Sequence, residues 1–311
     1  MSWVPELEEL RRREALARDA ASHPDRSSRV ERQHAAGKLT VHERIERLLD
    51  PGTFHEVGAL AGVAGYGEDG ELETFMPANM VVGQGEADGR GLVVQADDFT
   101  IRGGAADAAI WQKMVYAERM AHDLRLPLAR LVDGTGGGGS VKSLEQMGFT
   151  YVPFLPGMEV AVENMAIVPV VAAALGPVAG LGAARVVASH FSVIVRGTGQ
   201  LFVAGPPVVA AAMGESPDKE ALGGSRAQTR AGAVDNEAAD EDDALAQLRR
   251  FLSYLPATNS CPLPRTITEK CEATTRAAPS PATGPSAAAT TGTIARFSTA
   301  TSIPGRNGTY V

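Results

Sequence analysis

The chain has 311 residues and a formal net charge of −8, and 44% of its residues are hydrophobic. That length is enough for one large domain or two small ones, and the acidic balance, with no long run of Lys or Arg, argues against a nucleic-acid-binding protein. Met1–Arg32 lacks the apolar segment of a signal peptide, and no apolar run reaches the ~18 residues that cross a membrane. We therefore expect a cytoplasmic globular protein that binds neither nucleic acid nor a membrane.

The N-terminal part of the chain is predicted to be helical. Glu6–Ala20 is highly charged but has apolar residues at helical spacing, which indicates a surface or partner-packing helix. Thr40 and Glu43 have the spacing of a capping box, which marks the start of a second helix. That helix should end at Pro51-Gly52.

Strands are predicted to follow. Phe54–Leu60 has strand character, whereas Gly62–Phe75 is rich in Gly and Glu and is interpreted as a loop. Asn79–Glu86 and Gly91–Ala96 are two further strand candidates. The dipeptide Asp88-Gly89 between them is typical of a tight hairpin turn.

The second half of the chain alternates between the two kinds of element. Asp107–Leu124 and Asp240–Leu255 are predicted amphipathic helices, and Ala183–His190 is a shorter one. Phe191–Val195 is a predicted strand. Because hairpins and strand–helix units alternate, the predicted fold class is α/β.

Two glycine-rich turns stand out, and each follows an apolar run that predicts a buried strand. The first turn is Gly134–Ser140, after Leu131-Val132. The second turn is Gly176–Gly182, after Val168–Leu175. Glycine after a strand lets backbone N–H groups approach a ligand without a side chain in the way. Two such turns predict a site of main-chain donors that holds an oxyanion or a phosphate, provided that those amides are unpaired.

A dinucleotide site is a weaker interpretation of the first turn. Gly134–Gly139 satisfies G-x-G-x-x-G, but any run of four glycines satisfies many patterns. A Rossmann site also needs an acidic residue about 20 positions further on, at the end of a second strand. Glu159 lies near that distance, but proline and glycine interrupt the strand that it should end. The residues after the turn do not give the G-K-[ST] of a P-loop either.

The sequence shows no clear pattern of metal-binding, nucleophilic or acid–base side chains. The six histidines form neither H-x-x-x-H nor H-E-x-x-H, so no metal site is predicted. Ser140 and Ser225 lack the context of a nucleophile elbow. Asp97 and Asp98 are neighbours, but adjacent residues of a strand face opposite ways. The sequence thus favours a chemistry that depends on backbone donors and stabilises an enolate.

The C-terminal tail, residues 257–311, differs from the rest of the chain. It is rich in Thr, Ala, Pro and Ser and has a formal charge of +3, against −11 for residues 1–256. It contains both cysteines, Cys261 and Cys271, so neither disulfides nor a Cys-rich zinc site can organise the core. This composition predicts disorder, either as a natural linker-like tail or because the reading frame was lost near Pro256.

Six segments, in order from about Lys38 to Pro256, resemble the carboxyltransferase β subunits of biotin-dependent acyl-CoA carboxylases, such as propionyl-CoA carboxylase. They are Gly37-Lys38-Leu39-Thr40-Val41-His42-Glu43-Arg44-Ile45, Leu48-Leu49-Asp50-Pro51-Gly52-Thr53-Phe54-His55-Glu56, Asp98-Phe99-Thr100-Ile101-Arg102-Gly103-Gly104, Gly205-Pro206-Pro207-Val208-Val209, Glu220-Ala221-Leu222-Gly223-Gly224 and Ser253-Tyr254-Leu255-Pro256. The resemblance implies a crotonase-like (ClpP/crotonase) ββα superhelix: an N-terminal helical extension, 1–36; one carboxyltransferase N-domain, 37–256; and the tail.

The resemblance also implies a mechanism. In this family backbone amides hold the enolate of an acyl-CoA thioester, and carboxybiotin delivers CO2 to it. The family's Gly-Gly pair falls on Gly180 and Leu181, which are therefore the expected catalytic donors. The biotin itself is expected to take the substrate's α-proton, which agrees with the lack of a visible side-chain base. We expect no cofactor to be bound by this chain.

The acyl-CoA groove is expected at the other glycines. The resemblance assigns Gly103, Gly104, Gly136, Gly137, Gly138 and Gly139 to substrate binding. Typical members have Gly-Gly-Ala-Arg at the first turn, where this chain has Gly-Gly-Gly-Gly-Ser. Lys142 is the candidate for the missing positive charge.

Length is the largest departure from the family. Full β subunits resemble two such domains in tandem, and the second binds biotin. We therefore expect a truncated carboxyltransferase whose partners are a biotin carboxylase/biotin carrier α subunit and either further copies or a chain that supplies the C-terminal half. Two alternatives stay open: a biotin-dependent acyl-CoA decarboxylase subunit, which shares the site, and a non-catalytic remnant.

Overall fold

The structure is a computed structural model that describes residues 3–19, 24–104, 108–134, 158–215 and 217–255. These described residues all belong to one compact unit. The predicted disordered tail lies outside the described residues. The helices are α1 (Val4–Arg18), α2 (Pro24–Ala35), α3 (Val41–Leu48), the short 3-10 helix η2 (Arg102–Gly104), α4 (Ala108–Leu124), α6 (Glu159–Ile167), α7 (Leu181–Val187), α8 (Pro206–Met213), α9 (Lys219–Gly223), α10 (Ser225–Arg230) and α11 (Glu241–Ser253).

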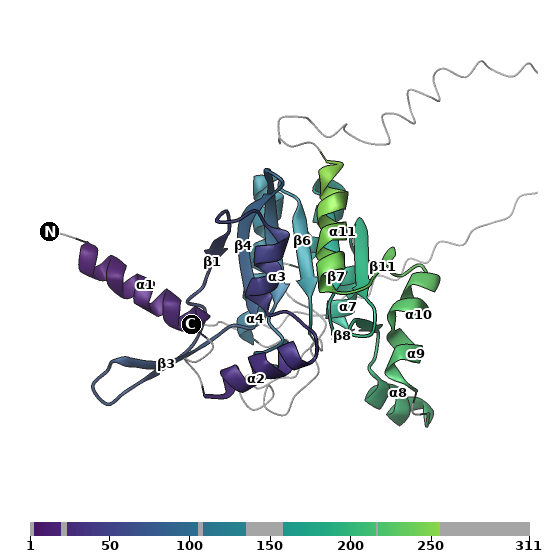
Figure 1. Ribbon diagram of the computed structural model, residues 1–311, viewed down its shortest axis with the longest axis horizontal. Coiled ribbons are helices and arrows are strands. Elements are labelled where there is room, and N and C mark those ends of the chain that lie inside the picture. Colours follow the sequence, from purple (N-terminus) through teal and green to yellow (C-terminus); the bar gives the residue numbers. More distant parts are fainter. Residues whose placement is uncertain (1–2, 20–23, 105–107, 135–157, 216, 256–311) are drawn as a thin grey trace, which may run out of the picture. The chain divides into compact units, whose positions relative to one another are not determined.

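A seven-stranded sheet forms the centre of this unit (Figure 1). The strands are β1 (His55–Val57), β2 (Gly62–Tyr66), β3 (Leu72–Pro77), β4 (Met80–Ala87), β5 (Arg90–Asp97), β6 (Leu128–Val132), β7 (Val170–Ala174), β8 (Pro177–Ala179), β9 (Phe191–Val195), β10 (Gln200–Phe202) and β11 (Asn236–Ala238). Seven of these strands form the central sheet, in the order β1-β4-β5-β6-β7-β9-β11, whereas β2 pairs with β3 and β8 with β10 in two separate small sheets. The pairs β1–β4 and β4–β5 are antiparallel, and all pairs from β5 to β11 are parallel. The carboxyl ends of five neighbouring strands therefore meet at one edge of the sheet.

Helices cover both faces of this sheet. Alternate strand residues such as Leu131 and Ala173 pack with α3 and α11 in one hydrophobic cluster. The intervening residues pack with α4 and α6, and nearer β9 with α7, in two further clusters. Figure 1 shows α3 and α11 on one face and α4 and α7 on the other. The completely buried runs of β6 and β7 follow from this double cover, which explains why the sequence showed them as continuous apolar segments.

Local signals in the sequence were accurate. The Thr40 hydroxyl accepts from the Glu43 amide, and the Glu43 carboxylate accepts from the Thr40 amide at 2.7 Å, so the predicted capping box is confirmed. The Asp88-Gly89 turn between β4 and β5 is also confirmed, and both of its residues have positive φ. The α/β class is correct.

The interpretation of Gly62–Phe75 as a loop is wrong. The segment contains an antiparallel hairpin of β2 and β3, with a register shift at Gly65/Tyr66. Most of its side chains are half-buried or exposed, with Val63 71% exposed, so the hairpin lacks the alternating burial that would have marked its strands. In the part of the chain that the structure describes, no helix is both long and apolar enough to cross a membrane.

Candidate active site

Glycines from three separate segments meet where β5, β6 and β7 end. A Cβ on Gly104 would lie 2.5 Å from the carbonyl oxygen of Asp133 and 2.7 Å from the Cα of Gly134. A Cβ on Gly134 would in turn lie 2.5 Å from the carbonyl oxygen of Gly104. Gly182, at the second turn, is 3.7 Å from the Gly134 carbonyl by the same measure. The backbones at Gly104 and Gly134 therefore approach to distances that only glycine permits, and Gly182 lies in ordinary contact with Gly134, so the three segments form one cluster.

Gly176 is a glycine because of a buried carboxylate. A Cβ at this position would overlap the carboxylate of Asp133, which is 0% exposed. That carboxylate binds the Lys38 ammonium at 2.7 Å and the Arg44 guanidinium at 2.7 Å. Arg44 also pairs with Glu241, at the start of α11. The glycine turns thus lie beside a buried ionic network in which two cations, Lys38 and Arg44, are balanced by two carboxylates, Asp133 and Glu241.

The pKa values of this network follow from burial and charge. Burial lowers the pKa of the Lys38 ammonium, and the neighbouring Asp133 only partly opposes this. Burial would also lower the pKa of Arg44, but Asp133 and Glu241 together raise it above its ordinary value. The Lys38 ammonium also lies 4.5 Å from the centre of the Phe99 ring, which favours its charged form.

The second turn presents one free amide fewer than expected. Gly180 has φ 58°, and its N–H donates to the carbonyl of Phe202 at 3.0 Å, which extends the parallel pairing of β8 with β10 by one bond. The expectation of two unpaired donors at Gly180 and Leu181 is therefore incorrect for Gly180 in this structure. Leu181 and Gly182 begin α7, where an amide has no acceptor inside the helix. Within this turn, the N–H groups of Leu181 and Gly182 can therefore donate to a ligand, because they lie in the first turn of α7 and have no acceptor within the helix.

A pocket of about 700 Å³ opens beside these turns, and we call it the turn pocket. Gly103 and Pro177 line it on the side of the glycine cluster. Its cationic lining residues are Arg29, Arg32, Lys38 and Lys219, and no described residue that lines it carries a carboxylate. The hydroxyl of Thr198, also in the lining, is buried and has no hydrogen-bond partner among the described residues. In a chain with a net charge of −8, this is a marked concentration of positive charge.

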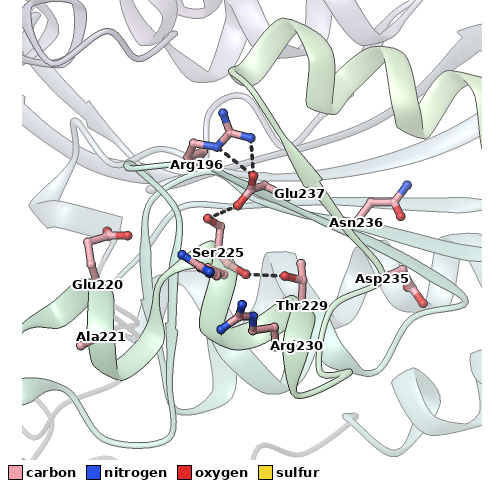
Figure 2. A pocket seen from close by; sticks show the side chains of 10 residues that line it. Arg196, Glu220, Ala221, Ser225, Thr229, Arg230, Asp235, Asn236 and Glu237 are labelled. Atoms are coloured by element: carbon pink, nitrogen blue, oxygen red, sulfur yellow. Dashed lines mark hydrogen bonds and ion pairs between the residues drawn. The ribbon is translucent and has the colours of Figure 1, made fainter.

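A second pocket, of about 840 Å³, lies between α9, α10 and the edge strand β11, and we call it the edge pocket (Figure 2). Its charges are balanced, because three arginines and three carboxylates line it. Glu237 binds the Arg196 guanidinium and accepts from the Ser225 hydroxyl at 2.5 Å. Asp235 accepts from Ser192. Asp235 and Glu237 are thus already paired within the chain, and the described lining of this pocket has no excess of either charge.

A third pocket, of about 770 Å³, lies on the other side of Thr100, among α1, α2 and α3. His42 and Glu56 line it, and their Nε2 and Oε2 atoms are 4.0 Å apart. Burial lowers the pKa of His42, more than the nearby Glu56 and Asp98 raise it. No group of three or more His, Cys, Asp or Glu side chains within the described ranges could hold a metal ion.

The predicted site residues fall into two groups. Gly103, Gly104, Gly180 and Leu181 belong to the described turns, and Gly103 lines the turn pocket. The predicted residues Gly136, Gly137, Gly138, Gly139 and Lys142 lie outside the described residues. Sequence reasoning missed the cations of α2 and the ionic role of Asp133. The segment around Lys38 was noticed as a family signature, but no local pattern shows that its ammonium binds a carboxylate 95 positions away.

Known proteins are similar to this chain in sequence and in fold. A family model described as carboxyl transferase domain matches residues 32–290. The mitochondrial propionyl-CoA carboxylase beta chain of Sus scrofa is 34% identical over 239 residues, which are 76% of this chain and 43% of that protein. The methylmalonyl-CoA decarboxylase subunit alpha of Veillonella parvula is 30% identical over 232 residues, covering 74% of this chain and 45% of that protein.

Solved structures agree. A transcarboxylase 12S structure with methylmalonyl-coenzyme A and methylmalonic acid bound matches with a TM-score of 0.68 and 27% identity, covering 84% of this chain and 49% of that one. This chain thus spans about half the length of the curated relatives and of this structure. Its fold is that of the crotonase-like carboxyltransferases. The chain belongs to the carboxyl transferase domain family.

Proposed function

We propose that this chain is the acyl-CoA-binding half of a biotin-dependent acyl-CoA carboxylase carboxyltransferase. The observation that carries the proposal is the turn pocket, which places cations and no described carboxylate beside a cluster of backbone glycines. Coenzyme A has phosphate groups at one end and a thioester at the other. A cationic pocket next to main-chain donors matches both ends of such a ligand.

The phosphates are assigned to the cations that face solvent. Arg32 and Lys219 are exposed residues from two separate helices, α2 and α9, that line the same pocket. Lys38 is held by Asp133 and contributes its charge from below the pocket surface. The unpartnered hydroxyl of Thr198 supplies a further donor. Arg and Lys bind phosphate well because charge-assisted hydrogen bonds are stronger than neutral ones.

The thioester oxygen is assigned to the second turn. Leu181 N–H is the main donor in this proposal, with Gly182 N–H beside it. The role predicted for Gly180 N–H requires its bond to Phe202 to open, so we assign Gly180 to shaping the turn instead. Loss of one such donor typically raises an activation barrier by ~2.7–4 kcal/mol.

Biotin is assigned to another chain. Carboxybiotin, carried by a partner, would supply the CO2 that the bound acyl-CoA accepts. In this proposal the described residues bind the thioester and its phosphates, and the family's biotin-binding half is expected on a second chain or in further sequence. The partners in this proposal are a biotin carboxylase/biotin carrier α subunit and an oligomer that completes the site, in the cytoplasm.

A decarboxylase role is the second candidate. The similarity to a methylmalonyl-CoA decarboxylase subunit is the observation that supports it. The same donors would then stabilise the enolate that decarboxylation leaves, so the acyl-CoA site is common to both proposals.

Binding of CoA esters by the purified chain tests this proposal. We expect acetyl-, propionyl- or methylcrotonyl-CoA to raise the melting temperature, and free coenzyme A to raise it less. Because the biotin site is assigned elsewhere, the chain alone should not carboxylate propionyl-CoA with free biotin or a biotin carrier. An absence of any response to all CoA compounds would contradict the acyl-CoA site and favour the non-catalytic remnant.

A further inference from the structure

Helix α7, which carries the second turn, is held in place by a buried arginine. Arg185 is 6% exposed, and its Nη1 donates to both carboxylate oxygens of Asp97, at 3.0 and 3.2 Å. Its Nε and Nη2 donate to the side-chain oxygen of Gln95, at 3.1 and 2.7 Å. Gln95 and Asp97 are on β5, so one guanidinium joins α7 to the strand that precedes Gly103.

The same carboxylate also reaches the first turn. Asp97 accepts a hydrogen bond from the backbone amide of Asp133 at 3.2 Å. Asp133 is the residue directly before Gly134, and its own carboxylate holds Lys38. Asp97 therefore links the two glycine turns, because it accepts from the amide just before the first turn and binds Arg185 on the helix that follows the second.

A second arginine holds the backbone of the same C-terminal turn of α7. Arg130, on β6, donates to the carbonyls of Arg185 at 3.1 Å and of Ala188 at 2.7 Å. Its guanidinium is itself paired with Glu118 at 2.8 Å. Arg185 lies in the last turn of α7, four residues after Leu181, so its side chain is held against β5 while its carbonyl is held by Arg130 of β6.

Stability alone does not explain this arrangement. A buried ion pair is often no more stabilising than apolar side chains of the same size, because both charges lose their water. Burial raises the pKa of the Asp97 carboxyl, and Arg185 and the Asp133 amide only partly oppose it. The pair does, however, give α7 one defined position, which is what a site of fixed backbone donors needs.

We propose that Arg185 is a positioning residue for the acyl-CoA site: through Asp97 it sets the geometry between the turn at Gly134 and the turn at Gly180–Gly182, and so directs Leu181 N–H at the thioester oxygen. This inference rests on the proposed function. Arg185 contacts no substrate in this account. It acts by holding α7, the helix that begins with the backbone donors.

The test follows the thioester carbonyl itself. Propionyl-CoA labelled with ¹³C at the carbonyl is titrated into the protein, and the carbonyl NMR signal of the bound ester is compared with that of the free ester. A hydrogen-bonded carbonyl is polarised and moves downfield. We expect this displacement in the wild-type chain and its loss in Arg185→Met. Arg185→Lys should show a partial displacement, because lysine keeps the positive charge but lacks the planar set of guanidinium donors.

Two controls separate positioning from folding. The affinity for free coenzyme A should change by less than about twofold in both variants, because the turn pocket is intact. Leu248→Ala, in the α11 core on the opposite face, should lower the melting temperature but keep the full displacement. If Arg185→Met does not fold, the double variant Arg185→Met/Asp97→Asn, which leaves no unpaired buried charge, replaces it and should also lose the displacement.

The outcomes distinguish the two proposals. A wild-type chain that binds no CoA ester, or binds it without a displacement, contradicts the proposed function. A wild-type displacement that persists in Arg185→Met or in the double variant overturns the positioning role while leaving the proposed function intact.

Discussion

The turn pocket and the edge pocket are similar in size, but they differ in how charge is arranged around them. The turn pocket has four cations, and the carboxylate that balances one of them, Asp133, is buried behind its wall. The edge pocket has its acids and bases together at the surface, as in the pair of Arg196 with Glu237. The difference teaches that two cavities of similar volume can differ in the charge of their described lining, and so in the charge of the ligand that each would favour.

Removing the acid that pairs with a lining cation of each pocket, Asp133 or Glu237, should give the largest contrast. Asp133→Ala leaves Lys38 with a buried charge that has lost its partner, so we expect unfolding to become easier by ~3–5 kcal/mol. Glu237→Ala breaks a pair whose arginine is 67% exposed, and we expect a loss below ~1 kcal/mol. Urea denaturation measures both. Equal losses would show that the buried network has no special role.

Glycine substitutions sharpen the comparison within the turns. Gly176→Ala should cost about 1–3 kcal/mol or more, because its Cβ would overlap the Asp133 carboxylate. Gly180→Ala has open space around its Cβ, so it should cost only the ~1–3 kcal/mol of strain that its positive-φ backbone, with φ 58° and ψ −121°, imposes on a side chain. Thermal denaturation of the two variants tests this order, and a reversed order would mean that the tight packing at Gly176 is not required.

The two pockets should also respond to opposite ends of the pH range. The folded chain lowers the pKa of Lys38, so folding releases protons, and stability should rise as pH increases from the folded pKa toward the ordinary value of 10.5. Lys38→Met should abolish this rise, although Asp133, Arg44 and Glu241 still face the site. Equilibrium unfolding of both proteins between neutral and alkaline pH provides the measurement, and an unchanged rise in Lys38→Met would contradict the assignment.

At the edge pocket we expect the stability of the fold to depend on pH in the acidic range instead. The hydrogen bond from Ser225 and the Arg196 guanidinium hold the pKa of Glu237 below its ordinary value of 4.5. Its contribution is therefore complete above that value and is lost as pH falls through the lower, folded pKa. This should be the smallest effect, because the pair is near solvent. Glu237→Gln should slightly reduce the loss of stability with falling pH, measured by equilibrium unfolding. A steeper loss in this variant would contradict the assignment.

The sequence predicted those features that neighbouring residues determine. The capping box of Thr40 and Glu43 and the hairpin turn at Asp88-Gly89 each lie within a few residues, so their patterns were sufficient. The buried parallel strands were also visible, because helices cover both of their faces. The β2–β3 hairpin was missed, since its side chains are mostly not buried.

The site depended on contacts between distant residues, and these left no local signal. The glycines were correctly singled out, but the reason for Gly176 is a carboxylate 43 positions earlier. The pairing of Gly180 N–H required β10, which the sequence did not show to lie beside the turn. The cations of the turn pocket come from α2, the segment before α3, and α9, so only the folded chain brings them together.

Calorimetric titration of propionyl-CoA tests the central claim most directly. The double variant Arg32→Gln/Lys219→Gln removes two exposed cations of the turn pocket, and Arg226→Gln/Arg230→Gln removes two arginines of the edge pocket as a matched control. We predict that the first variant binds about tenfold more weakly, or weaker still, and that the second binds within about twofold of the wild type. Equal binding by all three proteins, or a selective loss in the edge-pocket variant, would contradict the assignment of acyl-CoA to the turn pocket.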